Sequence, residues 1–358
     1  MSTELGLIEG YYGRPWTWDE RESQADFLSR HGYGFYLYAP KADAFLRKRW
    51  REPWPGETQG ALERFAARCR GLGLRFGVGL SPFEVYLDFN DAAKDALARR
   101  LADFDALGVE DLGIFFDDMR GDVPALAATQ IEILHWIAER SAATRIIFCP
   151  TYYSDDVQLD RGFGVRPPGY LEALGAGLDP AIEIFWTGEE VCSREYSPGH
   201  LDRVGEAIRR KPVLWDNYPV NDGPRMSPYL YIRAFTGRPA AIGASLTAHA
   251  VNPALQPVLS RIPLASLAES YRLGEAYQYG EAFARAAAEV LGPELAVLVQ
   301  RHLLTLQEVG LDRLEPGAKT RLRERYSAFD HPGAHEILKW LDGGYVVTRE
   351  MVEAEEGG

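Results

Sequence analysis

Eight short apolar runs alternate with longer mixed segments along the first two-thirds of the chain, and this alternation limits the fold more than any other feature. Most runs are nearly continuous in apolar residues, which is typical of parallel strands covered on both faces. The runs are Leu5–Tyr12, Gly34–Pro40, Leu74–Ser81, Leu112–Asp118, Arg145–Thr151, Ala181–Thr187, Pro212–Asn217 and Ala240–Thr247. They predict a parallel sheet with helical crossovers.

The segments between the runs have a helical period, with apolar residues three and four apart. The clearest are Thr17–Arg30, Ala61–Leu72, Ala92–Leu107 and Ala125–Ser141. Eight such units over roughly 250 residues match an α/β fold of the (β/α)₈ TIM-barrel type. A doubly wound sheet is the rival, but it usually has fewer strands and a glycine-rich phosphate turn, and no GxGxxG motif occurs here.

The sequence changes character after about Pro263. The following region is rich in Ala, Leu and Glu and almost lacks strand-forming runs. We therefore expect a catalytic barrel over 1–263 and a helical C-terminal region over 264–358, ending in a frayed acidic tail. Three roles stay open for this region: packing under the barrel, forming a homodimer contact, or lending residues to a neighbour's cleft.

Composition and charge limit the kinds of partner that we expect the protein to bind and the compartment in which we expect to find it. The net charge of −13 disfavours non-specific binding to nucleic acid or to an anionic membrane. The sequence has no uncharged apolar stretch near the roughly 20 residues of a membrane span, and its N-terminus lacks a signal-peptide pattern. The three cysteines, Cys69, Cys149 and Cys192, lie far apart and suggest buried thiols. We expect a cytoplasmic protein.

Polar residues and aromatics follow the predicted strands where active sites of such barrels lie, at the carboxyl ends. The segments are Glu9–Trp16, Tyr38–Lys41, Phe115–Asp118, Cys149–Tyr153, Trp186–Gly188 and Trp215–Asp222, followed by His249 and Asn252. Aromatic faces beside fixed hydrogen-bonding groups suit a sugar, which has apolar faces and a polar edge. A phosphate site would instead need glycine-rich loops and basic residues.

The adjacent pair Asp117-Asp118 is the sharpest chemical feature of this rim. Neighbours in a regular strand point to opposite faces, so both carboxylates can share a pocket only if the strand gives way to a loop there. Two carboxylates this close predict one raised pKa, which permits one proton donor and one charged stabiliser. A helix cap with a solvated acid, or a divalent-metal site, are the alternatives; the absence of clustered histidines disfavours the metal site.

Several motifs resemble those of family 84 glycoside hydrolases, the β-N-acetylglucosaminidases that include the protein O-GlcNAcases. The motifs occur in the family's order over about Gly6 to Pro263. They are Gly6–Trp16, Tyr38–Lys41, Trp50–Glu52, Phe116–Asp118, Cys149–Tyr153, Trp186–Gly188, Trp215–Asn217, Asn221-Asp222 and Asn252-Pro253. Their length and specificity make chance a poor explanation.

The resemblance implies roles for residues at the predicted centre of the site. Asp117 would orient and polarise the acetamido group of the substrate, and Asp118 would act as general acid and then as general base. Gly10 and Lys41 would bind the hydroxyl and carbonyl edge of the sugar. Tyr153 would form a hydrogen bond near the acetamido oxygen.

It also implies an outer set of sugar-binding residues. Trp215 and Asn217 would line the pocket, Asp222 would hold the outer hydroxyls, and Asn252 would add a further contact. The sequence departs from the family pattern at Ala42 and Tyr152, which both lie outside these roles. The extra domains of the animal enzymes have no counterpart here, which leaves the natural substrate open.

The implied activity is that of a retaining exo-β-N-acetylglucosaminidase using substrate-assisted catalysis through an oxazoline. The implied substrate is a terminal β-linked N-acetylglucosamine of the O-GlcNAc type, and neither a cofactor nor a metal is expected. Two alternatives remain: a chitinase-like or hyaluronidase-like hexosaminidase acting on longer glycans, and a non-catalytic sugar-binding barrel.

Overall fold

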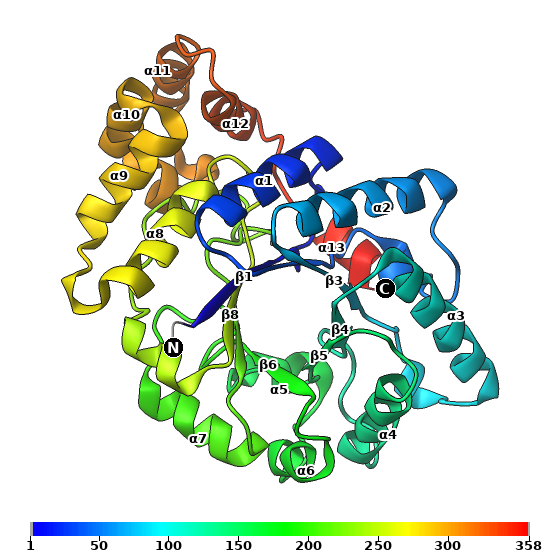
Figure 1. Ribbon diagram of the computed structural model, residues 1–358. Helices are drawn as coiled ribbons and strands as arrows, with labels where there is room; N and C mark the ends of the chain where they lie inside the picture. The colour runs from blue at the N-terminus through cyan, green and yellow to red at the C-terminus, as the bar shows by residue number, and fades with distance from the viewer. Residues whose placement is uncertain (1–2, 357–358) are drawn as a thin grey trace.

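The computed structural model describes residues 3–356, and eight parallel strands form a closed barrel at its centre (Figure 1). Neighbours pair in sequence order, and β1 closes the barrel by pairing with β8. The strands are β1 (Glu4–Ile8), β2 (Phe35–Tyr38), β3 (Arg75–Leu80), β4 (Asp111–Phe115), β5 (Arg145–Cys149), β6 (Glu183–Trp186), β7 (Val213–Asp216) and β8 (Ala248–Val251). The predicted TIM-barrel class is confirmed.

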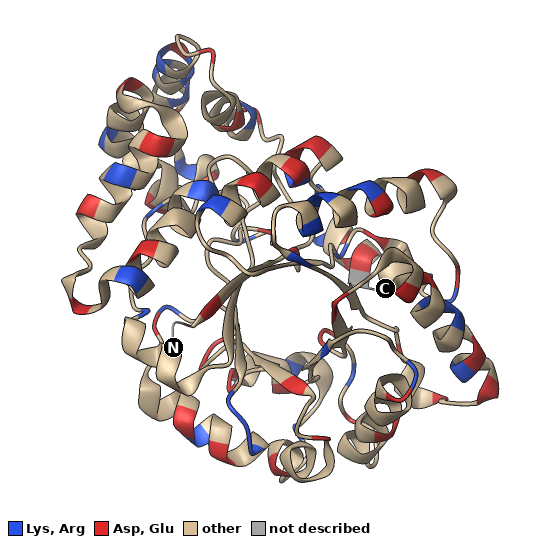
Figure 2. Cartoon of the chain, in the orientation of Figure 1, with Lys and Arg blue, Asp and Glu red and all other residues tan. Residues whose placement is uncertain are grey.

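Helices surround the barrel and cover its outer face (Figure 1). Those of the barrel layer are α1 (Trp18–Arg30), α2 (Gly56–Gly71), α3 (Asp91–Leu107), α4 (Leu126–Ala138), α5 (Val157–Phe163), α6 (Tyr170–Gly177), α7 (Pro198–Ile208) and α8 (Arg261–Leu273). The four helices expected from periodicity are all present. Figure 2 shows that many charged residues lie on the helices, while the strands carry few. No helix within residues 3–356 has the length and apolar character needed to span a membrane.

The predicted eighth strand was wrong in position. Ala240–Ser245 forms a 3-10 helix, and the strand follows it at Ala248–Val251. Alanine, glycine and serine are weak strand formers, so the small residues of the predicted run were a poor signal. The true strand contains His249, a polar residue that interrupts the apolar pattern. Its side chain is fully buried. The burial is tolerated because both ring nitrogens have polar partners: one lies 3.0 Å from Asp216, and the other lies 2.9 Å from the Tyr271 hydroxyl.

A ring of ion pairs closes the amino-terminal end of the barrel. Its five residues, Glu4, Arg75, Asp111, Arg145 and Glu183, are each the first residue of a strand. Arg75 contacts Glu4 at 2.8 Å and Asp111 at 2.9 Å. Arg145 contacts Glu183 at 2.6 Å and Asp111 at 3.4 Å. Each arginine therefore bridges carboxylates from different strands.

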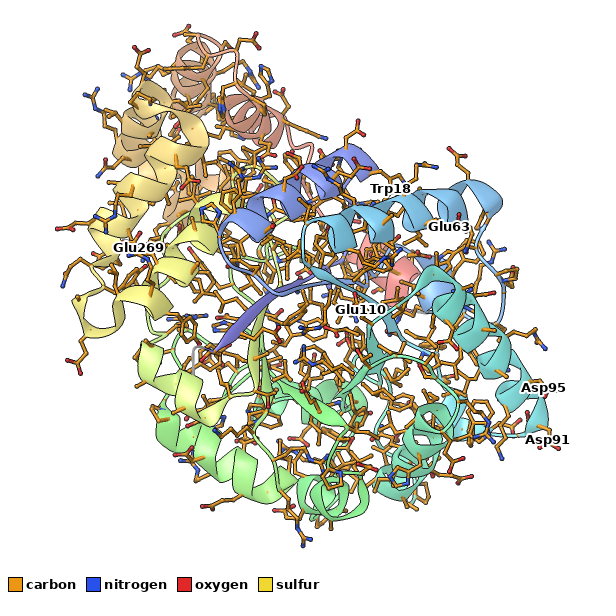
Figure 3. The ribbon with its side chains drawn as sticks, viewed as in Figure 1. Trp18, Glu63, Asp91, Asp95, Glu110 and Glu269 are labelled. Atoms are coloured by element: carbon orange, nitrogen blue, oxygen red, sulfur yellow. The ribbon has the colours of Figure 1, made fainter. Side chains whose placement is uncertain are left out.

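Aromatic side chains fill the barrel between this ring and the opposite end (Figure 3). The ring of Phe35 lies 4.9 Å from the Arg145 guanidinium. Closer to the carboxyl ends, Phe115, Phe185 and Trp215 form a cluster with centroids 5.2–5.9 Å apart. Edge-to-face packing of this kind gives a rigid interior. The opening at the centre of the ribbon is thus filled with side chains and is not a channel.

The C-terminal region is helical; most of it lies to one side of the barrel, while its last helix returns to the barrel (Figure 1). It contains α9 (Tyr279–Leu291), α10 (Pro293–Leu304), α11 (Pro316–Tyr326), α12 (Pro332–Leu341) and α13 (Arg349–Glu356). The domain boundary proposed after Pro263 falls within α8 and stays a prediction. The acidic end is helical through Glu356 where fraying was expected, and Gly357 and Gly358 lie outside the described residues.

Candidate active site

A pocket of about 140 Å³ opens at the carboxyl ends of the strands and collects every residue predicted for the site. Those nine residues are Gly10, Lys41, Asp117, Asp118, Tyr153, Trp215, Asn217, Asp222 and Asn252. The pocket is also lined by residues to which the sequence assigned no role, namely Tyr12, Cys149, Thr187, Val191, Cys192 and Val220. Residues from the carboxyl ends of seven strands, and from the loops that follow them, thus meet around one small volume.

The two neighbouring aspartates face the same pocket because the backbone changes direction between them. Strand β4 ends at Phe115, and Asp118 adopts a left-handed conformation with φ of 53°. Aspartate tolerates this region better than most residues. The predicted departure from strand geometry is therefore present, and it turns the second carboxylate back toward the first.

Lys41 lies between the two carboxylates at the bottom of the pocket. Its ammonium forms a short ion pair with Asp117 Oδ2 and lies 3.3 Å from Asp118 Oδ2. Burial alone would lower the pKa of Lys41, but the two carboxylates outweigh that effect and raise it. The lysine therefore stays charged.

The other oxygen of Asp117 has no hydrogen-bond partner among the described residues, although the residue is buried, with only 5% of its surface exposed. Leaving a buried charged acceptor unpaired is costly. An unpaired acceptor that lines a pocket is a place where a ligand can donate an N–H or O–H. Asp117 is thus fixed by Lys41 through one oxygen and free to accept through the other.

Asp118 is held by two tyrosines and an arginine. Its carboxylate accepts from the Tyr12 hydroxyl at 2.6 Å and from the Tyr153 hydroxyl at 3.1 Å. Arg47 donates to the Asp118 carbonyl at 2.8 Å. Burial raises the pKa of Asp118, but the charges of Lys41 and Arg47 and the two tyrosine hydrogen bonds together lower it below its usual value.

This direction corrects one expectation from the sequence. A raised pKa was predicted for one member of the pair on the ground of carboxylate–carboxylate repulsion. Lys41 between the carboxylates removes much of that repulsion, and the lowered pKa of Asp118 favours its ionised form. The sequence showed Lys41 on the rim but not that its ammonium lies between both acids.

A chain of hydrogen bonds joins the residues on the opposite wall. Trp215 Nε1 and Asn252 Nδ2 both donate to Asn217 Oδ1, at 3.0 and 2.9 Å. The Gly10 amide donates to Asn252 Oδ1 at 3.1 Å. A Cβ on residue 10 would lie 2.2 Å from the Trp215 indole, so only glycine fits there. The wall is therefore rigid and depends on that glycine.

Asp222 closes the upper part of the pocket. It accepts from the Tyr12 amide at 2.9 Å, and burial is the main reason that its pKa rises to about 6. Tyr12 thus connects Asp222, through its amide, with Asp118, through its hydroxyl. Tyr12 stands in a motif recognised in the sequence, but nothing there indicated this double contact.

Several other residues of the rim motifs serve the core instead. Trp16, Trp50, Trp54 and Trp186 are buried and do not line the pocket. Asp216 is fully buried in a bidentate ion pair with Arg238, at 2.7 and 2.8 Å.

Among the predicted buried thiols, Cys69 and Cys149 are buried, whereas Cys192 is exposed at the pocket wall. Over residues 3–356, no group of three His, Cys, Asp or Glu side chains is placed to hold a metal ion.

Comparisons with known proteins agree with this geometry. The sequence profile of the β-N-acetylglucosaminidase family matches residues 5–303. The protein O-GlcNAcases of Rattus norvegicus and Mus musculus are each 28% identical to the chain over 276 residues, which is 75% of this chain. The chain spans 30% of the length of these relatives. A mutant of the Thermobaculum terrenum O-GlcNAc hydrolase superposes with a TM-score of 0.78 at 30% identity, over 91% of this chain and 71% of the other.

Proposed function

Because the chain belongs to the β-N-acetylglucosaminidases of glycoside hydrolase family 84, we propose that it removes a terminal β-linked N-acetylglucosamine by substrate-assisted catalysis. The family resemblance of the sequence motifs is confirmed, and the activity is our proposal. One observation carries it: two adjacent carboxylates share a pocket, and one of them presents a buried, unpaired oxygen. That oxygen suits the N–H of a 2-acetamido group.

In the first step, Asp117 would accept the acetamido N–H through its unpaired oxygen while Lys41 holds the other. The negative charge makes the acetamido oxygen a better nucleophile. That oxygen attacks the anomeric carbon, the bond to the leaving oxygen breaks, and Asp118 gives that oxygen a proton. The products are a released alcohol and an oxazolinium ion, which keeps its N–H proton in a hydrogen bond to the Asp117 carboxylate.

In the second step, Asp118 takes a proton from water, and the water oxygen attacks the anomeric carbon. The oxazoline opens and the acetamido group is restored, so the β configuration is retained. The hydrogen bonds from Tyr12 and Tyr153 favour the ionised Asp118 that this step needs. The first step needs a proton on Asp118, so a bound sugar must raise its pKa by excluding water.

The remainder of the substrate has space beside the pocket. A hollow of about 810 Å³ shares Cys192 and Asn217 with it. Tyr231 and the arginines Arg194 and Arg225 line this hollow. Its position supports a substrate that is larger than one sugar. We propose an O-GlcNAc-type glycoside as that substrate.

The proposed reaction predicts a strict requirement for the acetamido group. Aryl β-N-acetylglucosaminide should be hydrolysed, and kcat/KM for the matched aryl β-glucoside should be at least about 10³-fold lower, since the glucoside lacks the internal nucleophile. The measurement is release of the phenol with and without a chelator. Comparable turnover of both glycosides would contradict substrate assistance.

A substrate panel separates O-GlcNAc-type glycosides from longer glycans. Glycopeptides carrying a single N-acetylglucosamine are compared with chitin and hyaluronan fragments at equal concentrations of terminal sugar. We expect a higher kcat/KM for the glycopeptides. A preference for either polymer fragment would instead favour a hexosaminidase of glycan chains.

The raised pKa of Asp222 predicts how binding depends on pH. A hydroxyl of the sugar donates best to the ionised carboxylate, which is lost as pH falls through about 6. We expect KM for the aryl N-acetylglucosaminide to rise below that pH. Asp222→Asn should raise KM roughly 10–100-fold at neutral pH and make it independent of pH in this range. An unchanged KM in the folded variant would contradict the binding role.

A further inference from the structure

The C-terminal segment returns to the barrel and contacts the loop that carries Tyr12. Glu355 in α13 accepts a hydrogen bond from the Gly13 amide at 3.0 Å. The two residues lie 342 positions apart in the chain. Lys48, which follows β2, donates to the Ala354 carbonyl at 2.7 Å. The end of the described chain is thus held on two loops next to the candidate active site.

Residues just before α13 make a second set of contacts, which hold the C-terminal segment against the same loop. A Cβ on Gly13 would lie 2.7 Å from a methyl of Val347, and Gly13 has φ of +91°. The Val347 amide donates to Ser227 at 3.0 Å, and both residues are buried. The guanidinium of Arg14 lies 5.9 Å from the Tyr345 ring. Consecutive residues of the Tyr12 loop are therefore packed against consecutive parts of the C-terminal segment.

Two carboxylates thus hold two successive amides of one loop. Asp222 accepts from the Tyr12 amide, and Glu355 accepts from the Gly13 amide. The same loop presents the Tyr12 hydroxyl to Asp118 at 2.6 Å. A shift of the loop at Gly13 would move the Tyr12 side chain and so disturb the carboxylate that it holds.

We infer that Glu355 is a positioning residue of the active site, which fixes the Tyr12 loop through Gly13. This inference rests on the proposed function for its kinetic consequences. Its structural part, the fixing of the loop, does not depend on any substrate.

Glu355 is partly buried where it contacts the loop. Burial is the main reason that its pKa is raised, the negative charge of Asp222 adds to the rise, and Lys41 opposes it. Lys48 donates to the neighbouring Ala354 carbonyl.

The experiment compares Glu355→Ala and Glu355→Gln with a matched control, Glu353→Gln, on the same helix. Glu353 is exposed. Glutamine can still accept from Gly13, whereas alanine cannot. We expect Glu355→Ala to lower kcat/KM for the aryl N-acetylglucosaminide roughly five- to tenfold, the effect of losing one typical hydrogen bond. Glu355→Gln should recover most of this activity.

Hydrogen exchange of the amides of residues 11–14 gives a readout that needs no substrate. Exchange should be faster in Glu355→Ala than in the parent chain and the control, and Glu355→Gln should be intermediate or normal. If exchange and kcat/KM are unchanged in Glu355→Ala, the inference is wrong. If exchange responds as expected but the parent chain does not hydrolyse the substrate, the proposed function fails and the positioning of the loop stands.

Discussion

Asp118→Ala should lose roughly 10²–10⁴-fold in kcat/KM on alkyl N-acetylglucosaminides and far less on substrates with an activated phenol. Asp118 is the proposed proton donor, and proton donation matters most when the departing oxygen is basic. An activated phenol leaves with little assistance. We use kcat/KM because slow breakdown of the intermediate would conceal the first step in kcat. The measurement is a series of leaving groups of increasing pKa.

Asp117→Ala is the matched comparison, because the two residues are adjacent and share the same pocket. Its loss should be similar for both kinds of leaving group, since Asp117 would act on the nucleophile and not on the departing oxygen. A steep leaving-group dependence in Asp117→Ala but not in Asp118→Ala would reverse the assignment. If neither variant is impaired, the pair is not the catalytic centre.

Asp216→Ala should destabilise the fold by about 3–5 kcal/mol, because it leaves the buried Arg238 guanidinium without its carboxylate. Burial raises the pKa of Asp216, but Arg238 and His249 outweigh that effect and lower it to about 2. An acid with a lowered folded-state pKa contributes stability above its unfolded pKa of about 4. That contribution is lost as pH falls from about 4 through 2. Urea unfolding at neutral pH measures the effect.

Asp122→Ala is the control for this prediction. Asp122 also pairs with an arginine, Arg120 at 2.9 Å, but both side chains are 55% exposed. An exposed pair of this kind contributes little to stability, because solvent screens the two charges. Equal shifts of the urea midpoint in the two variants would mean that burial of the Asp216 pair has no special importance.

Much of the fold could be predicted because the barrel repeats one pattern. Seven apolar runs became strands, and glycines at the predicted helix ends, such as Gly32 and Gly108, have positive φ. The eighth strand was missed for a tertiary reason. His249 satisfies its ring through Asp216 and Tyr271, which are 33 and 22 residues away in sequence. A polar residue paired by distant partners looks like a loop residue in the sequence alone.

For the candidate site, too, the sequence predicted which residues lie together but not the contacts between residues from different loops. The strand ends indicated where the site lies, because barrel topology brings these ends together, and the family resemblance predicted which nine residues line one pocket there. The direction of the Asp118 pKa was not predictable, since it depends on the Lys41 ammonium and on two tyrosine hydroxyls from other loops. The contact of Glu355 with Gly13 has no signal in the sequence, because no local pattern joins positions 342 residues apart.

The small, closed-ended pocket bears on how a polymer would be degraded, if a glycan chain were supplied. Edge-to-face aromatic side chains fill the barrel beneath this pocket of about 140 Å³, so a sugar that occupies it has no second way out and must be the terminal unit of its chain. Each encounter then shortens one molecule by one unit. Free monosaccharide should accumulate from the first turnover, while the viscosity of a long glycan solution falls only slowly. Internal cleavage would do the opposite, with an early collapse of viscosity and little monomer.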